Sequence, residues 1–92
     1  MRYKRRDNVV FRRIAGETLL IPIRGTLADL QRVFVLEGAG EFIWQELDGS
    51  KTMEEIRDAV AGRFEVGVEN AWKDVEEFIA ELSRRDLIAE AD

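Results

Sequence analysis

The spacing of apolar residues changes its period once along this 92-residue chain, close to Gly38 and Gly40. Before these glycines, three short runs rich in β-branched and aromatic residues are typical of strands, and residues 15–17 predict a hairpin turn between the first two runs. After them, apolar residues recur every three or four positions, which indicates helices with one apolar side. We therefore expect an α+β fold in which a three-stranded antiparallel sheet is followed by three helices. The predicted strands cover residues 8–14, 18–23 and 31–36, and the predicted helices cover residues 38–47, 52–64 and 68–82.

Local signals mark the ends of several of these elements. Pro22 has no N–H to donate, so we expect it at a strand end or on a sheet edge. Thr52 is followed three residues later by Glu55, which is a capping box and predicts a helix start. Residues 86–89 can add a short extended tail. The length suits a single domain, which we expect to span residues 8–92 after a basic N-terminal arm of residues 1–7.

The composition argues against catalysis. The chain contains no histidine and no cysteine, so the usual nucleophile–base pairs and nitrogen or sulfur metal sites are missing. The many carboxylates alternate with apolar residues along the helices, as expected of solvated faces. A calcium site would draw on Glu37, Glu41, Glu46 and Asp48, but these lack the alternating spacing of an EF-hand loop. We therefore predict a protein that is not an enzyme and that holds no metal and no cofactor.

The stretch "EGAGEFIWQELDGSKT", residues 37–52, superficially resembles a nucleotide-binding loop. A phosphate loop needs a glycine directly before its lysine, and Ser50 stands between Gly49 and Lys51. A dinucleotide fingerprint needs a third glycine, where this chain has Ile43. We therefore interpret the stretch as the passage from the third strand into the helices, with Phe42, Ile43 and Leu47 as core residues.

The charge is unevenly distributed along the chain. Residues 1–36 hold 8 Lys and Arg against 3 Asp and Glu, whereas residues 37–92 hold 6 against 16. Phosphate contacts need clustered basic side chains, and the acidic helices would repel nucleic acid. A DNA-binding winged helix remains an alternative that depends on the basic arm alone. That arm carries Arg2, Lys4, Arg5 and Arg6.

Two features that the sequence lacks indicate the cellular compartment. No apolar run approaches the roughly 20 residues that a membrane-spanning helix needs. The absence of cysteine is consistent with a reducing compartment. We therefore expect a cytoplasmic protein with no membrane segment.

Two long segments, "VFVLEGAGEFIWQELDGSKTMEEIRDAVAGRFEV" and "DVEEFIAELSRRDLI", together resemble the pyrroloquinoline quinone biosynthesis protein D (PqqD) family. The resemblance covers nearly the whole chain. It implies a small winged helix-turn-helix-like domain that acts as a recognition element for ribosomally made and then modified peptides (a RiPP recognition element). Such a domain binds the leader of a precursor peptide by strand addition. It acts as a peptide chaperone that presents the leader to a tailoring enzyme, typically a radical S-adenosylmethionine (radical SAM) protein.

The resemblance also implies where the leader binds. The peptide would add along the third strand and pack against the last helix. An exposed strand edge offers unpaired N–H and C=O groups, so this mode of binding makes physical sense. From spacing alone, Trp72, Val75 and Ile79 are more typical of a core than of a peptide groove. The implied strand residues are Arg32, Val33, Phe34, Val35 and Leu36, and the implied helix residues are Trp72, Val75, Glu76 and Ile79.

Two further expectations concern the partners. Family members dedicated to the quinone cofactor carry a Pro-Glu pair after the second strand, where this chain reads "IPIRGTL". The segment "GEFIWQELDG", residues 40–49, is more similar to that of stand-alone members that serve varied peptide pathways. A free third-strand edge also permits pairing between two copies, so the protein is expected as a monomer or a strand-exchanged dimer. A purely structural or dimerisation module is therefore a second alternative to peptide binding.

Overall fold

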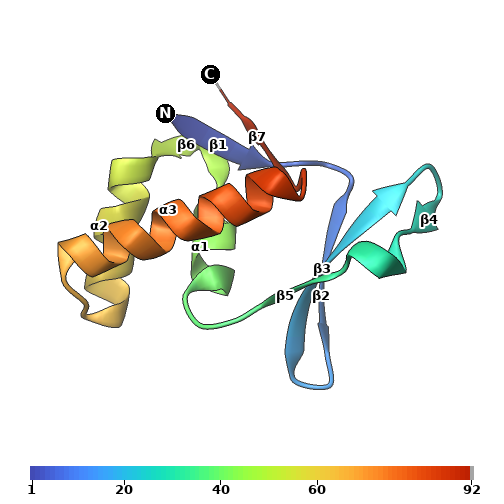
Figure 1. Ribbon diagram of the computed structural model, residues 1–92, viewed down its shortest axis with the longest axis horizontal. Helices are drawn as coiled ribbons and strands as arrows, with labels where there is room; N and C mark the ends of the chain where they lie inside the picture. The colour runs from blue at the N-terminus through green and yellow to red at the C-terminus, as the bar shows by residue number, and fades with distance from the viewer. Residues whose placement is uncertain (92) are drawn as a thin grey trace.

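The computed structural model describes residues 1–91, and within that range it contains two small antiparallel sheets and three α-helices (Figure 1). The helices are α1 (Gly40–Glu46), α2 (Met53–Phe64) and α3 (Val68–Arg84). They lie to one side of the longer sheet, and the shorter sheet brings the first residues of the chain beside residues 88–91 (Figure 1). The predicted α+β, winged-helix-like fold is therefore confirmed.

The longer sheet grows from the predicted hairpin. Strands β2 (Val9–Ile14) and β3 (Glu17–Arg24) pair through a turn in which Ala15 and Gly16 have φ angles of 52° and 82°. Two consecutive positive φ angles match the right-handed twist of the flanking strands. The other edge of β3 pairs with β5 (Phe34–Leu36) and, near its end, with the short β4 (Leu27–Ala28).

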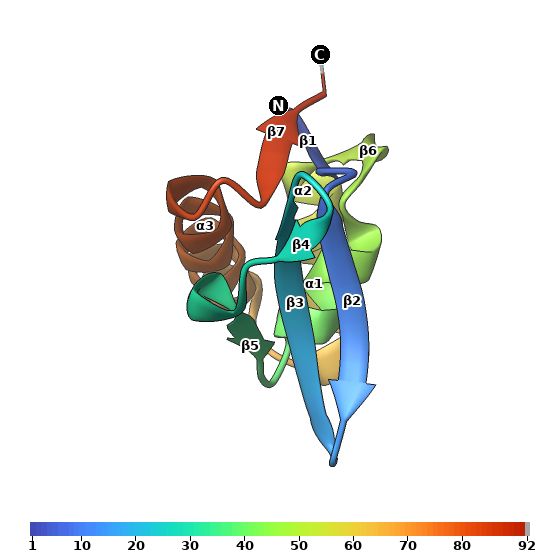
Figure 2. The ribbon, with the colours of Figure 1, turned by 90° about the vertical axis from the view of Figure 1, so that its right-hand side faces the viewer.

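The third predicted strand is shorter than expected. Residues 30–32 form a turn of 3₁₀ helix, η1 (Leu30–Arg32), and the strand begins only at Phe34. Its register sets Leu19 opposite Val35 and Leu20 opposite Phe34. Figure 2 shows β5 on the α3 side of β3, so β5 forms the edge of this sheet.

The basic N-terminal residues are part of the fold and do not form a separate arm. Strand β1 (Arg2–Arg5) lies between β6 (Asp48–Thr52) and β7 (Ile88–Glu90) in the shorter sheet. Tyr3 packs against the core, and the Arg5 guanidinium donates to the backbone oxygens of Trp44 and Gln45 at 2.8 and 3.0 Å. These carbonyls belong to the negative end of α1, which stabilises a cation there. The predicted boundary at residue 7 therefore does not separate two structural units.

Residues 48–52, which lie between the first two predicted helices, form strand β6. Lys4 of β1 lies opposite Asp48. Asp48 accepts hydrogen bonds from the backbone N–H and hydroxyl of Ser50, which lower the pKa of its carboxyl to about 2. These residues form a strand because they pair with β1, which is distant in sequence, and they complete the shorter sheet.

The core lies between the helices and the inner face of the longer sheet. Ile43 and Leu47 are buried there as predicted, whereas Phe42 is half-buried and its ring meets Phe64 edge-on at 5.7 Å. The buried hydroxyl of Thr18 donates to the carboxylate of Glu41 at 2.7 Å. No helix within the described range is long and apolar enough to cross a bilayer. The buried apolar residues are Leu20, Leu36, Ile43, Trp44, Leu47, Ile56, Val60, Ala71, Val75, Ile79, Leu82, Leu87 and Ile88.

The predicted capping box at the start of α2 is present. The Thr52 hydroxyl accepts from the Glu55 N–H at 3.1 Å, and the Glu55 carboxylate accepts from the Thr52 N–H at 2.8 Å. We expect Thr52→Ala to lower the free energy of unfolding by about 1 kcal/mol, because one N–H of the first turn loses its partner. Urea denaturation measures this, with Thr26→Ala in the exposed β3–β4 turn as the control. An equal effect of both substitutions would contradict the assigned role of the box.

Candidate functional site

A groove of about 420 Å³ lies between the start of α1 and one side of α3. The chain leaves β5 directly into this groove, and Figure 1 shows β5 and α3 running in opposite directions beside it. Its walls are mixed, with aromatic and small residues at the base and carboxylates at the rim. The lining residues are Glu37, Ala39, Gly40, Ile43, Asp74, Glu77, Phe78 and Glu81.

The edge of β5 beside this groove is open. Among the described residues, β5 pairs only with β3, on its other side. Alternate backbone N–H and C=O groups of such an edge point outward and are free to pair with another extended chain. The edge is also short, which limits pairing with unspecific partners. It therefore offers a specific place for one added strand.

Two aromatic rings form the base of the site where β5 meets α3. Phe34 points inward because strand side chains alternate, and its ring centroid lies 6.3 Å from that of Phe78. The guanidinium of Arg85 lies 4.7 Å from the centroid of the Phe34 ring. A cation above an aromatic face is attracted to it, so Arg85 holds the ring in place. Both rings are half-buried, which leaves apolar surface for a ligand.

Gly40 allows α1 to approach α3 closely beneath the groove. A Cβ atom at this position would lie 3.1 Å from Cε1 of Phe78, which is tighter than ordinary van der Waals contact. We expect Gly40→Ala to displace the Phe78 ring into the groove and to weaken ligand binding about 5-fold, since packed interiors transmit such shifts. Binding calorimetry and the NMR shifts of the Phe78 ring measure the effect.

A glycine in α2 provides the control for that substitution. Gly62 has no atom within 4 Å of a built Cβ. Gly62→Ala should therefore raise the free energy of unfolding by about 0.5–1 kcal/mol and leave binding unchanged. If Gly40→Ala behaves in the same way, the close approach to Phe78 does not shape the groove.

One carboxylate at the rim is already engaged within the protein. Glu81 accepts from Nε of Arg85 at 2.6 Å and also pairs with Arg84. The hydrogen bond from Arg85, followed by the nearby charge of Arg84, holds the pKa of the Glu81 carboxyl below its ordinary value. Glu81 therefore stays ionised and keeps Arg85 in position above Phe34.

The strand residues implied by the resemblance fall into three environments. Phe34 lies next to Phe78, which lines the groove, whereas Val35 is 40% exposed on the opposite face of the sheet and Leu36 is buried in the core. Arg32 ends η1 and is exposed, and Val33 follows it in extended conformation before the strand begins. Only Phe34 and the backbone of the strand are thus placed to meet a ligand in the groove.

The helix residues implied by the resemblance do not line the groove. Val75 and Ile79 are buried, with 0% and 4% of their surface exposed. Trp72 packs towards α2, where the Arg57 guanidinium lies 5.5 Å from the centroid of its ring. Glu76 is exposed but is turned away from the groove, because it lies about 160° around the helix from Asp74.

The helix residues that the resemblance implied stay a prediction, and they lie on a neighbouring stripe of α3. The side that meets β5 carries residues three or four positions apart, adjacent to the buried stripe. Phe78 was the available signal, because it is a large aromatic residue at the border between the apolar and acidic stripes. The residues missed in this way are Asp74, Glu77, Phe78 and Glu81.

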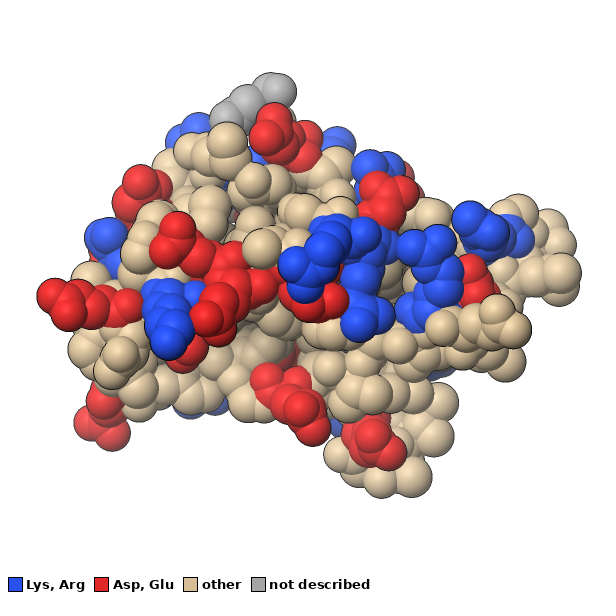
Figure 3. Space-filling view, in the orientation of Figure 1, with Lys and Arg blue, Asp and Glu red and all other residues tan. Residues whose placement is uncertain are grey.

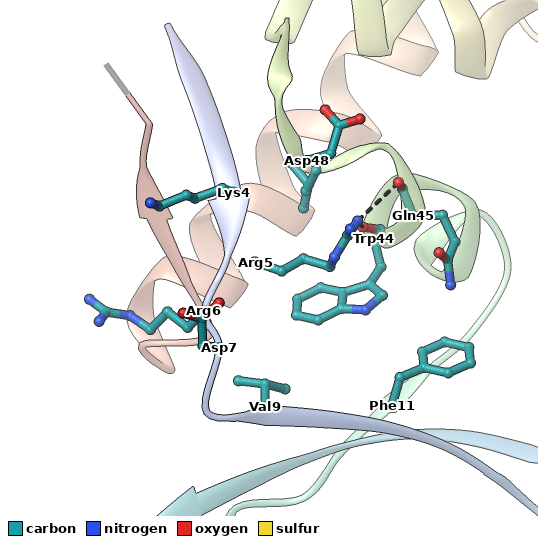
Figure 4. Close-up of a pocket in the computed structure, with 10 residues that line it drawn as sticks. Lys4, Arg5, Arg6, Asp7, Val9, Phe11, Trp44, Gln45 and Asp48 are labelled. Atoms are coloured by element: carbon teal, nitrogen blue, oxygen red, sulfur yellow. Dashed lines mark hydrogen bonds between the residues drawn. The ribbon is translucent and has the colours of Figure 1, made fainter.

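A second hollow, of about 510 Å³, lies between β1, the start of β2 and the end of α1 (Figure 4). Figure 4 shows the Arg5 side chain extended across it towards the carbonyl groups at the end of α1, with the Trp44 ring alongside. Arg6 pairs with Asp86 at 2.9 Å. Arg5 is bonded to the end of α1 and Arg6 is paired with Asp86, so the side chains around this hollow stabilise the position of β1. Among residues 1–91, no cluster of carboxylates is arranged to hold a metal ion.

Comparison with known proteins assigns the chain to a family. The family model described as Coenzyme PQQ synthesis protein D (PqqD) matches residues 17–88, which run from β3 to β7 and include the whole groove. The chain therefore belongs to the PqqD family, and the resemblance inferred from the sequence is confirmed.

A solved structure has the same fold. TbiB1, whose structure was determined in complex with the TbiA(β) leader peptide, is 28% identical to this chain. The likeness covers 92% of this chain and 93% of TbiB1, with a TM-score of 0.72. A search of curated proteins finds no match.

Proposed function

We propose that this protein binds the leader of a ribosomally synthesised precursor peptide and presents it to a tailoring enzyme. The observation that carries the proposal is the open edge of β5 beside an aromatic-based groove on α3. Membership of the PqqD family and the similarity to TbiB1, a protein solved with a leader peptide, support it.

The proposed ligand is an extended segment that adds to the longer sheet next to β5. Its backbone bonds to the outward N–H and C=O groups of the strand and supplies affinity independent of sequence. Because strand side chains alternate, every second side chain of the ligand faces the rings of Phe34 and Phe78. The remaining side chains continue the outer face of the sheet, next to Val35. Specificity therefore comes from the groove, and the outer set is available to a second protein.

The protein itself acts as a non-catalytic chaperone in this proposal. Holding the leader needs no cofactor, and the chemistry belongs to the partner enzyme. For the PqqD family that partner is typically a radical SAM protein, and we assign one to this chain on that basis. The assembly belongs in the cytoplasm, where a ribosomal precursor meets its modifying enzyme.

Backbone NMR tests the proposal. The ligand is the leader of a short precursor encoded beside the gene, titrated into ¹⁵N-labelled protein, with a scrambled peptide of the same composition as the control. We expect saturable shifts at residues 34–40 and along the groove side of α3, residues 74–85. Shifts confined to β2, the other edge of the sheet, would overturn the proposed site. No saturable response to any such leader would overturn the function.

The DNA-binding alternative has lost its basis. It depended on a free basic arm, and the structure places that arm in β1. Arg5 is held by the end of α1 and Arg6 by Asp86. Residues 2–5 therefore belong to a strand paired on both sides and do not form the free arm that this alternative needs.

The dimerisation alternative uses the same edge of β5 as the leader. Two copies could pair their edges, and the short strand would then bury little surface. Sedimentation at several concentrations decides between the two. A concentration-dependent dimer that a leader peptide does not dissociate would favour the alternative over leader binding.

A further inference from the structure

The two ends of the proposed peptide groove carry opposite charge. Glu37, after β5, and Asp74 and Glu77, in the middle of α3, lie at one end. Arg32, before β5, and Arg85, at the end of α3, line a neighbouring hollow past the other end, on the side of the Phe34 ring. Figure 3 shows mainly acidic side chains, with a basic side chain among them, over the N-terminal part of α3 and basic side chains gathered over its C-terminal end.

The carboxylates at the acidic end are not neutralised by the protein. Within residues 1–91, no ion pair joins Glu37, Asp74 or Glu77 to a cation, although the ion pairs of other carboxylates are well formed. Lys73 lies about 100° around the helix from Asp74 and about 40° from Glu77, one turn away, but among the described residues it forms an ion pair with neither. These three charges therefore face the groove and solvent.

The basic end keeps a net positive charge. Glu81 is shared by Arg84 and Arg85, so one carboxylate serves two guanidinium groups. Arg32 is exposed and, among the described residues, forms no ion pair. The groove is thus polarised along its length, with the Phe34 and Phe78 rings between its ends.

The separation of the charges fixes the spacing that a ligand needs. From Asp74 to Arg85 the helix advances eleven residues, or about 16 Å at 1.5 Å per residue. An extended peptide covers this length in about five residues, at roughly 3.3 Å each. The central positions of such a segment lie over the aromatic rings.

We propose that the groove selects a leader segment with a Lys or Arg at one end and an Asp or Glu about four to six residues away, at an even spacing that sets both side chains on the groove face of the added strand. An apolar side chain between them faces the two rings. This inference rests on the proposed function and adds the chemical pattern that the ligand carries. Electrostatic complementarity of this kind sets register and rejects wrong partners. The order of the two charges reports the strand direction, since the basic residue comes first only in a peptide antiparallel to β5.

Selection from a phage library of random twelve-residue peptides tests the inference. The baits are the wild-type protein and a variant with Glu37→Lys, Asp74→Lys and Glu77→Lys. The control variant, Glu54→Lys, Glu65→Lys and Glu90→Lys, has the same net charge but changes exposed residues away from the groove. The control separates local complementarity from the overall field of the protein.

The wild type and the control variant should enrich peptides with opposite charges about four to six residues apart, at an even spacing. The groove variant should instead enrich peptides in which an acidic residue replaces the basic one. A synthetic wild-type consensus peptide should bind the groove variant about 30-fold more weakly and the control within about 3-fold, since like charges now face each other.

The possible outcomes distinguish the inferred charge pattern from the proposed function, leader binding. Enriched peptides that shift the NMR signals of β5 and α3 but lack the charge pattern would overturn the inference and leave leader binding intact. Selection of the same consensus peptide by the wild type and by the groove variant would also overturn the inference and leave leader binding intact. No enriched peptide that shifts β5 and α3 would count against both.

Discussion

Replacing Phe78 by alanine is expected to weaken leader binding by about 30-fold or more. The Phe78 ring forms the base of the groove and packs against Phe34, 6.3 Å away, so its loss removes the apolar surface on which the central ligand side chain rests. Aromatic anchors at the centre of an interface commonly contribute about 2 kcal/mol or more. Isothermal titration calorimetry measures the dissociation constant.

Phe64→Ala is the control for this prediction. Phe64 is 40% exposed, meets Phe42 edge-on at 5.7 Å and does not line the groove. Phe64→Ala removes the same number of atoms as Phe78→Ala from a partly buried site, so it should lower the free energy of unfolding to a similar degree. It should change the dissociation constant of the leader by less than about 2-fold. Equal losses of affinity in both variants would mean that the Phe78 ring acts only through stability.

Replacing Val75 by alanine is expected to lower the free energy of unfolding by about 2–3 kcal/mol. Val75 has no exposed surface, and the substitution leaves a cavity among close-packed neighbours. For a domain of this size, the melting temperature should fall by roughly 8–24 °C. Leader affinity, measured well below that temperature, should stay within about 2-fold of the wild type, because Val75 lies in the core and not in the groove.

Val68→Ala is the comparison, since the same substitution falls on the same helix. Val68 begins α3 and is 51% exposed, so its loss should cost less than about 0.5 kcal/mol. Thermal denaturation of the two variants is enough to compare them. If the Val75→Ala protein keeps its free energy of unfolding but no longer binds the leader, Val75 belongs to the binding site.

The elements that the sequence predicted well are those with local causes. The β2–β3 hairpin follows from a turn that glycine permits, and the start of α2 follows from the pair Thr52 and Glu55. The helices follow from apolar stripes several turns long. Each of these signals lies within the element itself, so no distant partner is needed to recognise it.

The shorter sheet could not be predicted in this way. Its strands come from the start, the middle and the end of the chain, and β1 contains only one apolar side chain besides the stems of its basic residues. Backbone pairing with β6 and β7 and the bonds of Arg5 to α1 stabilise it. Such long-range pairing leaves no periodic signal in a four-residue segment.

The candidate site was predicted in outline but not in its residues. The sequence and the resemblance indicated the third strand and the last helix, and both border the groove. Spacing alone identifies the apolar stripe of α3 but not which flank of that stripe turns towards β5. The crossing of α3 over the sheet decides this, and it turns Asp74, Phe78 and Glu81 to the groove while Val75 and Ile79 enter the core.

Scanning N-methylation of the leader is the most direct test of strand addition to β5. Each N-methyl group removes one backbone donor of the peptide and leaves the protein unchanged, so folding effects do not enter. We expect alternate positions across the segment of about five residues to lose about 10-fold or more in affinity, with the intervening positions little affected, because only every second N–H faces β5. A leader that tolerates N-methylation at every position while still binding the groove would contradict the account.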